Sequence, residues 1–360
     1  MKIILILFIT LTILNTIYSS DRDAQENPSL FLSSQIDTLS DTQLFSHFHK
    51  LMGKQYDLTT EEGLKRFNIF RENLVEIREF NADKTNTYIK GITSYTDLTH
   101  AEYLEDRGLL VKHQVKNQKN NTKEPIEEVK RLLSEEKPEN LTLPFTPIDW
   151  RSSKGVNPPQ QANYKCSSTS HMSFVAAIET CYFAKNNVLL KLSSQQAIDC
   201  LLNCETFDPL HDYRYFMKFG MMSEATYPFS GQGQKPCDYY PNKVVAKPKS
   251  WAYYHGLFKM DVVTSYESLK HCPYVTIQGF RTPRDYVGGV FNPADCDGSG
   301  SYYGLVTVVG YGVDSGVEYW IVNNHSGVNW GDKGFLKVKR RDDQHGCGIT
   351  SSFWSRPSFE

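Results

Sequence analysis

Cysteine is absent from the first 160 residues of this 360-residue chain, and all eight cysteines lie in the remainder. The N-terminal part must therefore fold without disulfide bonds, whereas the C-terminal part has the residues to form several. The chain length suits two or three domains. The uneven use of cysteine is the first indication of a boundary between them.

An excess of charge of one sign is also absent, because 39 basic residues face 41 acidic ones. This balance gives no indication of nucleic acid or of an anionic membrane as a partner. The sequence contains no glycine-rich phosphate loop, no Cys-x-x-Cys pair and no internal repeat. We therefore expect no cofactor and no metal ion.

Long apolar runs are absent after residue 20. The run at residues 1–20 follows Lys2 and ends in Ser19 and Ser20, just before a charged segment. That order is typical of a secretory signal peptide. The alternative, a membrane anchor, would need about 20 apolar residues, and this run is shorter and has polar breaks. We predict a signal peptide at 1–20, no membrane association after its removal, and a location in the secretory pathway, either extracellular or in an endolysosomal lumen.

Residues 40–83 have the apolar spacing of two helices. The second helix opens on residues 59–62, which have the sequence of a capping box. The expected apolar positions are Leu44, Phe45, Phe48 and Leu51 in the first helix, and Leu64, Phe67, Phe70, Leu74 and Ile77 in the second.

The composition changes twice after these helices. Residues 107–144 are rich in lysine, glutamate, asparagine and proline, which predicts a charged linker. From residue 145 on, helix-forming runs at about 168–184 and from 193 precede short β-rich runs at 276–280, 304–312, 318–324 and 334–340. This order predicts an α+β domain over 145–360.

The second predicted helix also carries a set of residues that recur every three or four positions and so share one helix face. They are Glu62, Arg66, Phe70, Asn73, Ile77 and Asn81. A shorter pattern follows at Gly91, Thr93, Tyr95 and Asp97.

Both patterns resemble motifs of the inhibitory prodomain in the papain-like cysteine peptidases of the cathepsin L type. The first motif is complete in this chain, and the second is present in a weakened form. The chain resembles this family over about residues 40–105 and 147–354. The resemblance implies an inhibitory helical prodomain at 21–106, the linker at 107–144, and a peptidase domain at 145–360. The implied fold is α+β and papain-like, with a helical left lobe and an antiparallel β-barrel as the right lobe.

The resemblance also implies a set of disulfides. The family would pair Cys166 with Cys204, Cys200 with Cys237, and Cys296 with Cys347. Two cysteines, Cys181 and Cys272, are then left over. Since Cys181 lies on an apolar helix, we expect it to be a small core residue.

Papain-type chemistry needs a cysteine thiolate at a helix N-terminus, a histidine base, an asparagine that orients the histidine, and an oxyanion-binding glutamine. In this chain the family positions are occupied by Thr169 (nucleophile), Gly304 (base), Asn324 (orienting Asn) and Asn163 (oxyanion). Only the orienting asparagine matches the family. Two tryptophan positions of the family are also changed, to Ser170 and Ser326.

Hydroxyl groups are the alternative nucleophiles. A threonine or serine needs an adjacent base, and His325, next to Asn324, is the candidate. His171 follows Thr169 by two positions, and side chains at that spacing point apart on a helix. Ser167, Ser168 and Ser170 lack a base for the same reason as Thr169.

We therefore expect a papain-like peptidase homologue that is catalytically inactive and has a peptide-binding groove. One alternative is an active endopeptidase with a remodelled centre that uses a serine or threonine and His325. Another is that the prodomain inhibits active relatives. The expected partners are peptides, peptidase inhibitors or active cathepsin-like peptidases, and the chain is expected to be a monomer.

Overall fold

A computed structural model describes the chain in segments. These are residues 27–107, 113–114, 146–162, 168–201, 209–231, 234–255, 262–294, 301–302, 304–340, 346–350 and 353–360. The predicted signal peptide and all of the predicted linker except Arg107 and residues 113–114 lie outside the described residues, as do Asn163, Cys166, Ser167, Cys204 and Cys296.

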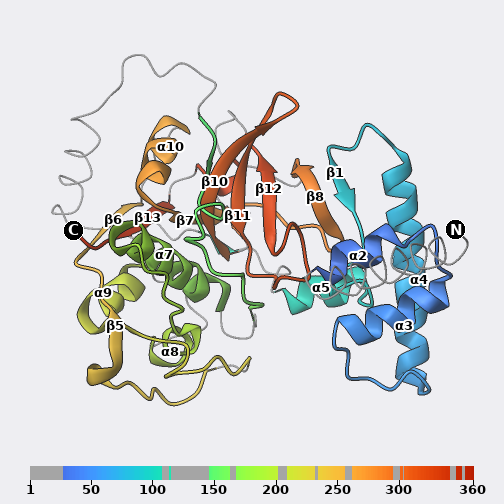
Figure 1. The fold of residues 1–360 in the computed structure, drawn as a ribbon, viewed down its shortest axis with the longest axis horizontal. Coiled ribbons are helices and arrows are strands. Elements are labelled where there is room, and N and C mark those ends of the chain that lie inside the picture. The colour runs from blue at the N-terminus through green and yellow to red at the C-terminus, as the bar shows by residue number, and fades with distance from the viewer. Residues whose placement is uncertain are drawn as a thin grey trace, which may run out of the picture. The chain divides into compact units, whose positions relative to one another are not determined.

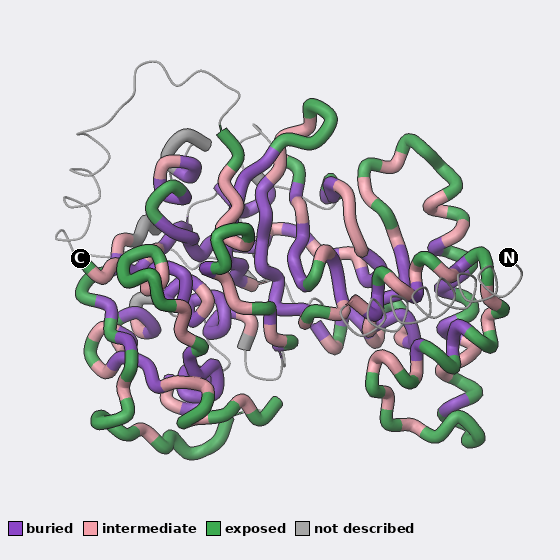
Figure 2. Tube along the Cα trace, viewed as in Figure 1, coloured by how far each residue is buried: buried purple, intermediate pink, exposed green. Residues whose placement is uncertain are grey.

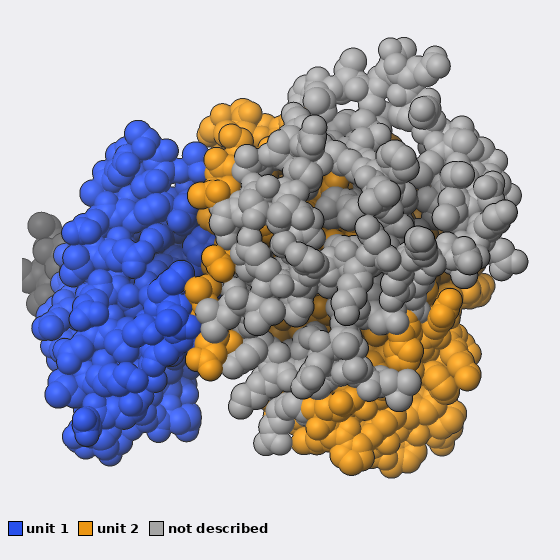
Figure 3. All heavy atoms as spheres, turned by 180° about the vertical axis from the view of Figure 1, so that it is seen from behind, with its two compact units in different colours: residues 1–103, 283–289, 328–333 blue, residues 104–282, 290–327, 334–360 orange. Residues whose placement is uncertain are grey.

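The described chain forms two compact units, drawn in blue and orange in Figure 3. The first unit comprises residues up to 103 together with 283–289 and 328–333. The second comprises 104–282, 290–327 and 334–360. Each unit is described by itself below.

The first unit is mainly helical. Its elements are α2 (Pro28–Ser34), α3 (Asp41–Leu51), α4 (Glu61–Ala82), the strand β1 (Tyr88–Lys90) and most of α5 (His100–Asp106). The two helices expected over 40–83 are confirmed as α3 and α4. In this unit β1 pairs antiparallel with the first residues of β8 (Tyr286–Phe291).

Capping and packing fix the two long helices. Ser40 and Gln43 form a reciprocal capping box at the start of α3. The box predicted at 59–62 is wrong, because Thr60 is the N-cap of α4 and the third helical residue is Gly63, which has no side chain to reach back. The apolar core includes Phe45, Phe48, Phe70, Leu74 and Ile77. Leu64, predicted on this face, is instead 59% exposed.

The second unit contains a mainly antiparallel sheet. Its strand order is β8, β12 (Phe335–Lys339), β11 (Val317–Asn323), β10 (Gly304–Asp314), β7 (Tyr274–Gln278), β13 (Phe353–Ser358) and β6 (Ser250–His255). The last two residues of β8 pair parallel with β12. The four predicted β-rich runs correspond to β7, β10, β11 and β12.

Shorter strands complete this unit. β3 (Ile148–Asp149) pairs with β10, β2 (His113–Gln114) pairs with β9 (Ser301–Tyr302), and β4 (Met221–Met222) pairs with β5 (Val244–Ala246). Short 3-10 turns lie at Pro241–Lys243 and Gly346–Gly348.

Several helices accompany the sheet in the described part of this unit. They are α7 (Ser168–Asn186), α8 (Ser194–Cys200), α9 (Pro209–Phe219) and α10 (Val262–His271). Figure 1 shows α7, α8 and α9 gathered at one end of the unit. The expected α+β class, with helices preceding the strand-rich part, is confirmed.

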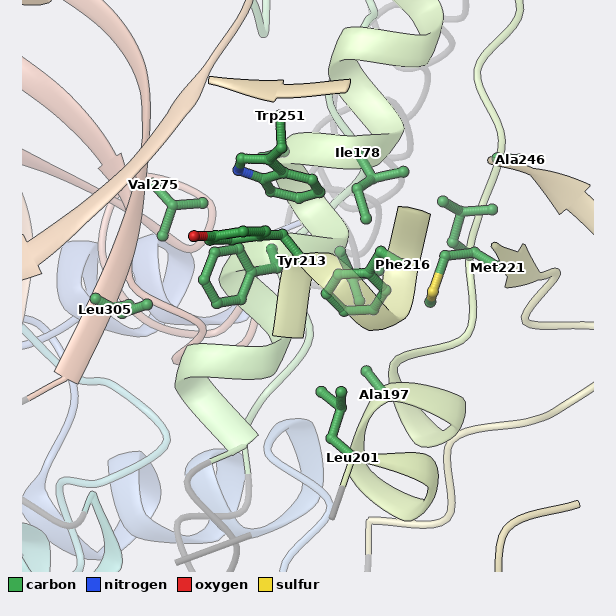
Figure 4. Close-up of a cluster of buried hydrophobic side chains, with 14 of the residues drawn as sticks. Ile178, Ala197, Leu201, Tyr213, Phe216, Met221, Ala246, Trp251, Val275 and Leu305 are labelled. Atoms are coloured by element: carbon green, nitrogen blue, oxygen red, sulfur yellow. The ribbon is translucent and has the colours of Figure 1, made fainter. Parts of the chain in front are cut away.

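An aromatic cluster joins these helices to the sheet. Trp251 of β6 stacks on Tyr213 and Phe216 of α9 (Figure 4). Phe174 of α7 meets Trp251 edge-on. Strand β10 is buried from Leu305 to Gly312, and Figure 2 shows buried residues along the central strands. This packing holds the start of α7 and the start of β10 in fixed positions.

Two disulfides lie within the described residues. Cys200 pairs with Cys237, as the resemblance implied. Cys181 pairs with Cys272, so the expectation that both were left over is wrong. The reason is that α7 packs on β7, and Cys272 lies two residues before that strand begins. Closing a loop of 91 residues in this way stabilises the fold by about 4–5 kcal/mol in the chain-entropy account.

The third predicted bridge is described at one end only. Cys347 is disulfide-bonded, while Cys296, its predicted partner, lies outside the described residues, as do both members of the predicted Cys166–Cys204 pair.

Candidate functional site

The start of α7 and the start of β10 are joined through one serine. The Ser173 hydroxyl donates to the carbonyl oxygens of Thr169 (2.8 Å) and Leu305 (3.0 Å). Thr307 in turn donates to the carbonyl oxygen of Ser173 at 2.9 Å. Ser173 therefore links the backbone at Thr169, the position predicted for the nucleophile, to the residue that follows Gly304, the position predicted for the base.

Gly304 offers no group for proton transfer. It pairs with Gln278 of β7, and its φ of 159° lies at the edge of the extended range. A Cβ atom placed there would have no atom within 4 Å. The position predicted for the base is therefore both without a side chain and open.

Asn324 is buried, and its side chain is bound to hydroxyl groups. Its Nδ2 donates to the Ser326 Oγ at 2.8 Å and lies 3.5 Å from the Thr282 Oγ1. Among the described residues no imidazole contacts this amide. The one family position that the sequence retains therefore has no histidine to orient.

His325, the alternative base, is buried in a position of its own. Its φ of 50° is in the left-handed region, and its backbone N–H donates to the Asn323 Oδ1 at 3.0 Å. The ring Nε2 is buried, and no described residue hydrogen-bonds to it. Burial, followed by the nearby positive charge of Arg107, lowers the pKa of His325 to about 3. The imidazole is therefore neutral over the physiological pH range.

The His325 ring lines a small cavity that is not lined by Thr169, Gly304 or Asn324. Its walls come from residues 156–160, from α7, from the start of α8 and from the end of β11. The acid in this cavity is Glu179, which accepts a hydrogen bond from the Leu192 backbone N–H at 2.7 Å. Burial raises the pKa of Glu179 to about 7. His325 is thus paired with neither a hydroxyl nucleophile nor a carboxylate among the described residues.

His171 points to an acid that sequence reasoning missed. Its Nδ1 lies 3.2 Å from the Asp212 Oδ2, and both side chains are buried. Burial alone would raise the pKa of Asp212, but hydrogen bonds with His171 and His211 hold it below its usual value. No described hydroxyl contacts the buried Nε2 of His171, which agrees with the expectation that His171 does not serve Thr169.

Two further residues at this site were not singled out in the sequence. Arg107, the first residue of the predicted linker, is 6% exposed and donates to the carbonyl oxygens of both Asn324 and His325. Gln161 forms an isolated β-bridge with Ser326. This bridge brings the backbone of Gln161 to Ser326, which binds the orienting asparagine, whereas the predicted oxyanion residue Asn163 lies outside the described residues.

In the first unit, the predicted prodomain motif forms a connected polar network. Arg66 donates to Glu62 at 2.6 Å and to Glu102 at 3.0 Å. Asn73 donates to the carbonyl oxygens of Thr96 and Leu98. Asn81 exchanges two hydrogen bonds with the backbone of Lys90, while Phe70 and Ile77 are fully buried.

The second prodomain pattern is buried as well. Thr93 and Tyr95 lie in the interior, and Asp97 accepts from Lys54 at 2.7 Å and from the Tyr56 hydroxyl at 3.0 Å. At Gly91 a Cβ atom would come within 2.2 Å of the Ser33 Oγ, so the pattern needs glycine there.

Within the described residues, no cluster of three or more histidine, cysteine or acidic side chains is arranged to hold a metal ion. In the same part of the chain, no helix has both the length and the apolar character needed to cross a membrane.

Comparison with known proteins gives two family matches. Residues 145–356 match the papain family cysteine proteases, and residues 45–103 match the cathepsin propeptide inhibitor domain. A cathepsin L-like proteinase of Phaedon cochleariae is 33% identical over 329 residues, which cover 87% of this chain and 93% of the relative. Germination-specific cysteine protease 1 of Arabidopsis thaliana is 32% identical, over 79% of this chain and 75% of the relative.

Among solved structures, digestive procathepsin L 3 from the larval midgut of Tenebrio molitor has a TM-score of 0.70 at 24% identity, over 89% of this chain and all of that one. This likeness shows a papain-like fold with an N-terminal propeptide domain.

Proposed function

This chain belongs to the papain family of cysteine proteases, and we propose that it is a member that binds peptides without hydrolysing them. The observation that carries the proposal is the state of the base position. Gly304 has no side chain, and the amide of Asn324 is bound to Ser326 and Thr282 instead of to an imidazole. The nucleophile position carries the Thr169 hydroxyl, whose proton has no acceptor group among the described side chains.

The size of the expected loss follows from general experience with catalytic triads. In a serine protease, removing the nucleophile and base together lowers turnover by about 10⁶-fold. Binding and oxyanion contacts alone leave roughly 10³–10⁴-fold acceleration over water. A residual effect of that size does not support protein digestion.

An active hydrolase with a remodelled centre is the less favoured reading. It needs a hydroxyl within hydrogen-bonding distance of a base. His325 is neutral and lines a cavity apart from Thr169, and its Nε2 meets no described hydroxyl. These contacts favour loss of activity over a new catalytic pair.

A second candidate function is inhibition of active relatives by the first unit. The observation that favours it is the connected network on α4, in which Arg66, Asn73 and Asn81 each make at least two hydrogen bonds. Addition of the full chain to an active cathepsin L-like peptidase should slow it, and Arg66→Ala should weaken the effect. If neither protein slows any such peptidase, this function is excluded.

We further propose that the protein enters the secretory pathway and stays in its proform. The apolar N-terminal run and the disulfides within the described residues support the location, because such bridges persist in oxidising compartments. A chain without a nucleophile–base pair cannot remove its own prodomain. Another peptidase would have to cut the 107–144 linker.

Two measurements test the main proposal. The purified chain, before and after its linker is cut by an added peptidase, should release a fluorogenic peptide's dye no faster than buffer does. Incubation at acid pH should leave the chain at its original length. Release of dye by the cut chain, or self-conversion at acid pH, would overturn the proposal.

A further inference from the structure

Arg107 is a buried cation whose guanidinium is held by neutral groups. Its Nη1 donates to the His325 carbonyl oxygen at 3.1 Å and its Nη2 to the Asn324 carbonyl oxygen at 2.9 Å. Its Nε is buried and has no partner among the described residues. Within that part of the chain no carboxylate forms an ion pair with Arg107. The hydrogen bonds to these two backbone carbonyls are therefore the main interactions that hold the guanidinium.

These carbonyls are positioned by contacts that do not involve the guanidinium. The His325 carbonyl also accepts from the Ala162 N–H at 2.8 Å. The His325 N–H is bound by Asn323, and the Asn324 amide is bound by Ser326. The left-handed φ of His325 turns the chain between the two carbonyls. Their orientation should therefore persist when the guanidinium is absent.

The arrangement suits arginine better than lysine. Two different nitrogens of one planar group each reach one of two successive carbonyls, which is the forked geometry that a guanidinium provides. An ammonium group is a point donor on a flexible stem and lacks this match. Loss of the arginine would leave two buried acceptors that water or another donor must satisfy.

We propose that the carbonyl oxygens of Asn324 and His325 form a guanidinium-binding site, which Arg107 fills in the intact chain and which takes the arginine side chain of a peptide when Arg107 is removed or displaced. The inference deepens the proposed function by naming the peptide class, and it rests on the proposed peptide binding but not on the proposed loss of hydrolysis. The site includes the backbone of the orienting-asparagine position, Asn324.

Removal of the side chain should open the site in the full chain. Arg107→Ala is compared with the unaltered chain and with Arg356→Ala, a control that removes another arginine, partly buried and bound to a backbone carbonyl. Methylguanidinium at about ten times its dissociation constant should raise the melting temperature of Arg107→Ala by about 2–4 °C. Methylammonium should not, and neither compound should act on the unaltered chain or on Arg356→Ala.

Direct binding supplies the second readout. A fluorescent peptide with a single arginine between alanine and glycine residues should bind Arg107→Ala at least ten-fold more tightly than it binds the unaltered chain. Replacement of that arginine by lysine or citrulline should lower the affinity at least ten-fold. If Arg107→Ala does not fold, Arg107→Gln, which keeps one donor group, takes its place in both measurements.

Equal binding by Arg107→Ala and the unaltered chain, or no preference for arginine over lysine, would overturn the site. Turnover of the same peptide is measured in parallel. Arginine-selective binding with hydrolysis would keep the site and refute the proposed inactivity. Absence of both would refute the site and leave the proposed inactivity intact.

Discussion

Buried ionisable groups have different partners in two regions of the molecule. In the first unit, Lys54 pairs with Asp97 at 2.7 Å, and Arg284 pairs with Asp285 at 2.7 Å. Around Asn324 in the second unit, Arg107, His325 and Glu179 are buried, and none of them forms an ion pair with another described residue. The buried charges of the first unit thus have charged partners, whereas Arg107, His325 and Glu179 lack charged partners among the described residues.

The difference indicates where changes of charge should affect the stability of the fold most. A buried ionisable group without a charged partner favours its neutral form, since nothing offsets the cost of removing the charge from water. His325 and Glu179 show this, with pKa values of about 3 and about 7. Changes of pH and single substitutions near Asn324 should therefore have a strong effect on stability. In the first unit, the same changes should lower stability by breaking ion pairs.

The largest expected effect comes from restoring the missing groups. Thr169→Cys combined with Gly304→His should raise peptide turnover by about 10³–10⁴-fold over the unaltered chain, because nucleophile and base act as a unit. The open space at Gly304 accommodates the new ring. Each single variant serves as the control and should stay at the background rate. A fluorogenic assay after linker cleavage measures this, and equal rates for the double and single variants would contradict it.

The next effect concerns His325. A folded-state pKa of about 3, below the usual value of 6.5, means that its stabilising contribution is present above pH 6.5 and is lost as the pH falls toward 3. The full span corresponds to about 5 kcal/mol. The variant His325→Asn should remove this loss of stability at low pH, and asparagine tolerates the left-handed φ. Urea unfolding from pH 7 to 3 measures the difference between variant and unaltered chain, and a pH-independent difference would contradict the account.

Glu179 should act in the opposite direction. Its folded-state pKa of about 7, above the usual 4.5, gives a contribution that is present below pH 4.5 and is lost as the pH rises through 7. This span corresponds to about 3 kcal/mol. Glu179→Gln should therefore become more stable relative to the unaltered chain as the pH rises from 4.5 to 7.5. A relative stability that does not change with pH would show that Glu179 has charged partners after all.

The smallest effect tests the paired region. Asp97→Asn keeps the shape of the side chain but removes the charge that balances Lys54 and accepts from Tyr56. The unfolding free energy should fall by about 2–3 kcal/mol. Glu72→Gln, at an exposed position on α4, is the control and should change it by less than about 0.5 kcal/mol. A loss of the same size in both variants would remove the contrast between the regions.

Much of the fold could be predicted from the sequence because the signals are local. Apolar spacing located α3 and α4, and β-rich runs located β7, β10, β11 and β12. The contacts that decide the site are not local. Arg107 meets Asn324 and His325 across more than 200 positions, and no pattern in the linker composition marks it.

The dependence on long-range contacts also explains why the prediction for Cys181 and Cys272 was wrong and why the Asp212 contact was missed. Cys181 and Cys272 pair because α7 packs on β7, which spacing alone does not reveal. The Asp212 partner of His171 lies on α9, whose position depends on the stacking of Tyr213 and Phe216 on Trp251. The roles assigned to Thr169 and Gly304 stay predictions, and they came from the resemblance, which supplied the long-range order that the residues themselves do not encode locally.

Thr169 is expected to carry no catalysis. The most direct measurement compares peptide hydrolysis by the linker-cleaved chain with that of its Thr169→Ala variant, at acid and at neutral pH. The account predicts identical rates that equal the buffer rate at both pH values. A rate above buffer that falls in Thr169→Ala would show a working hydroxyl nucleophile and would contradict the account.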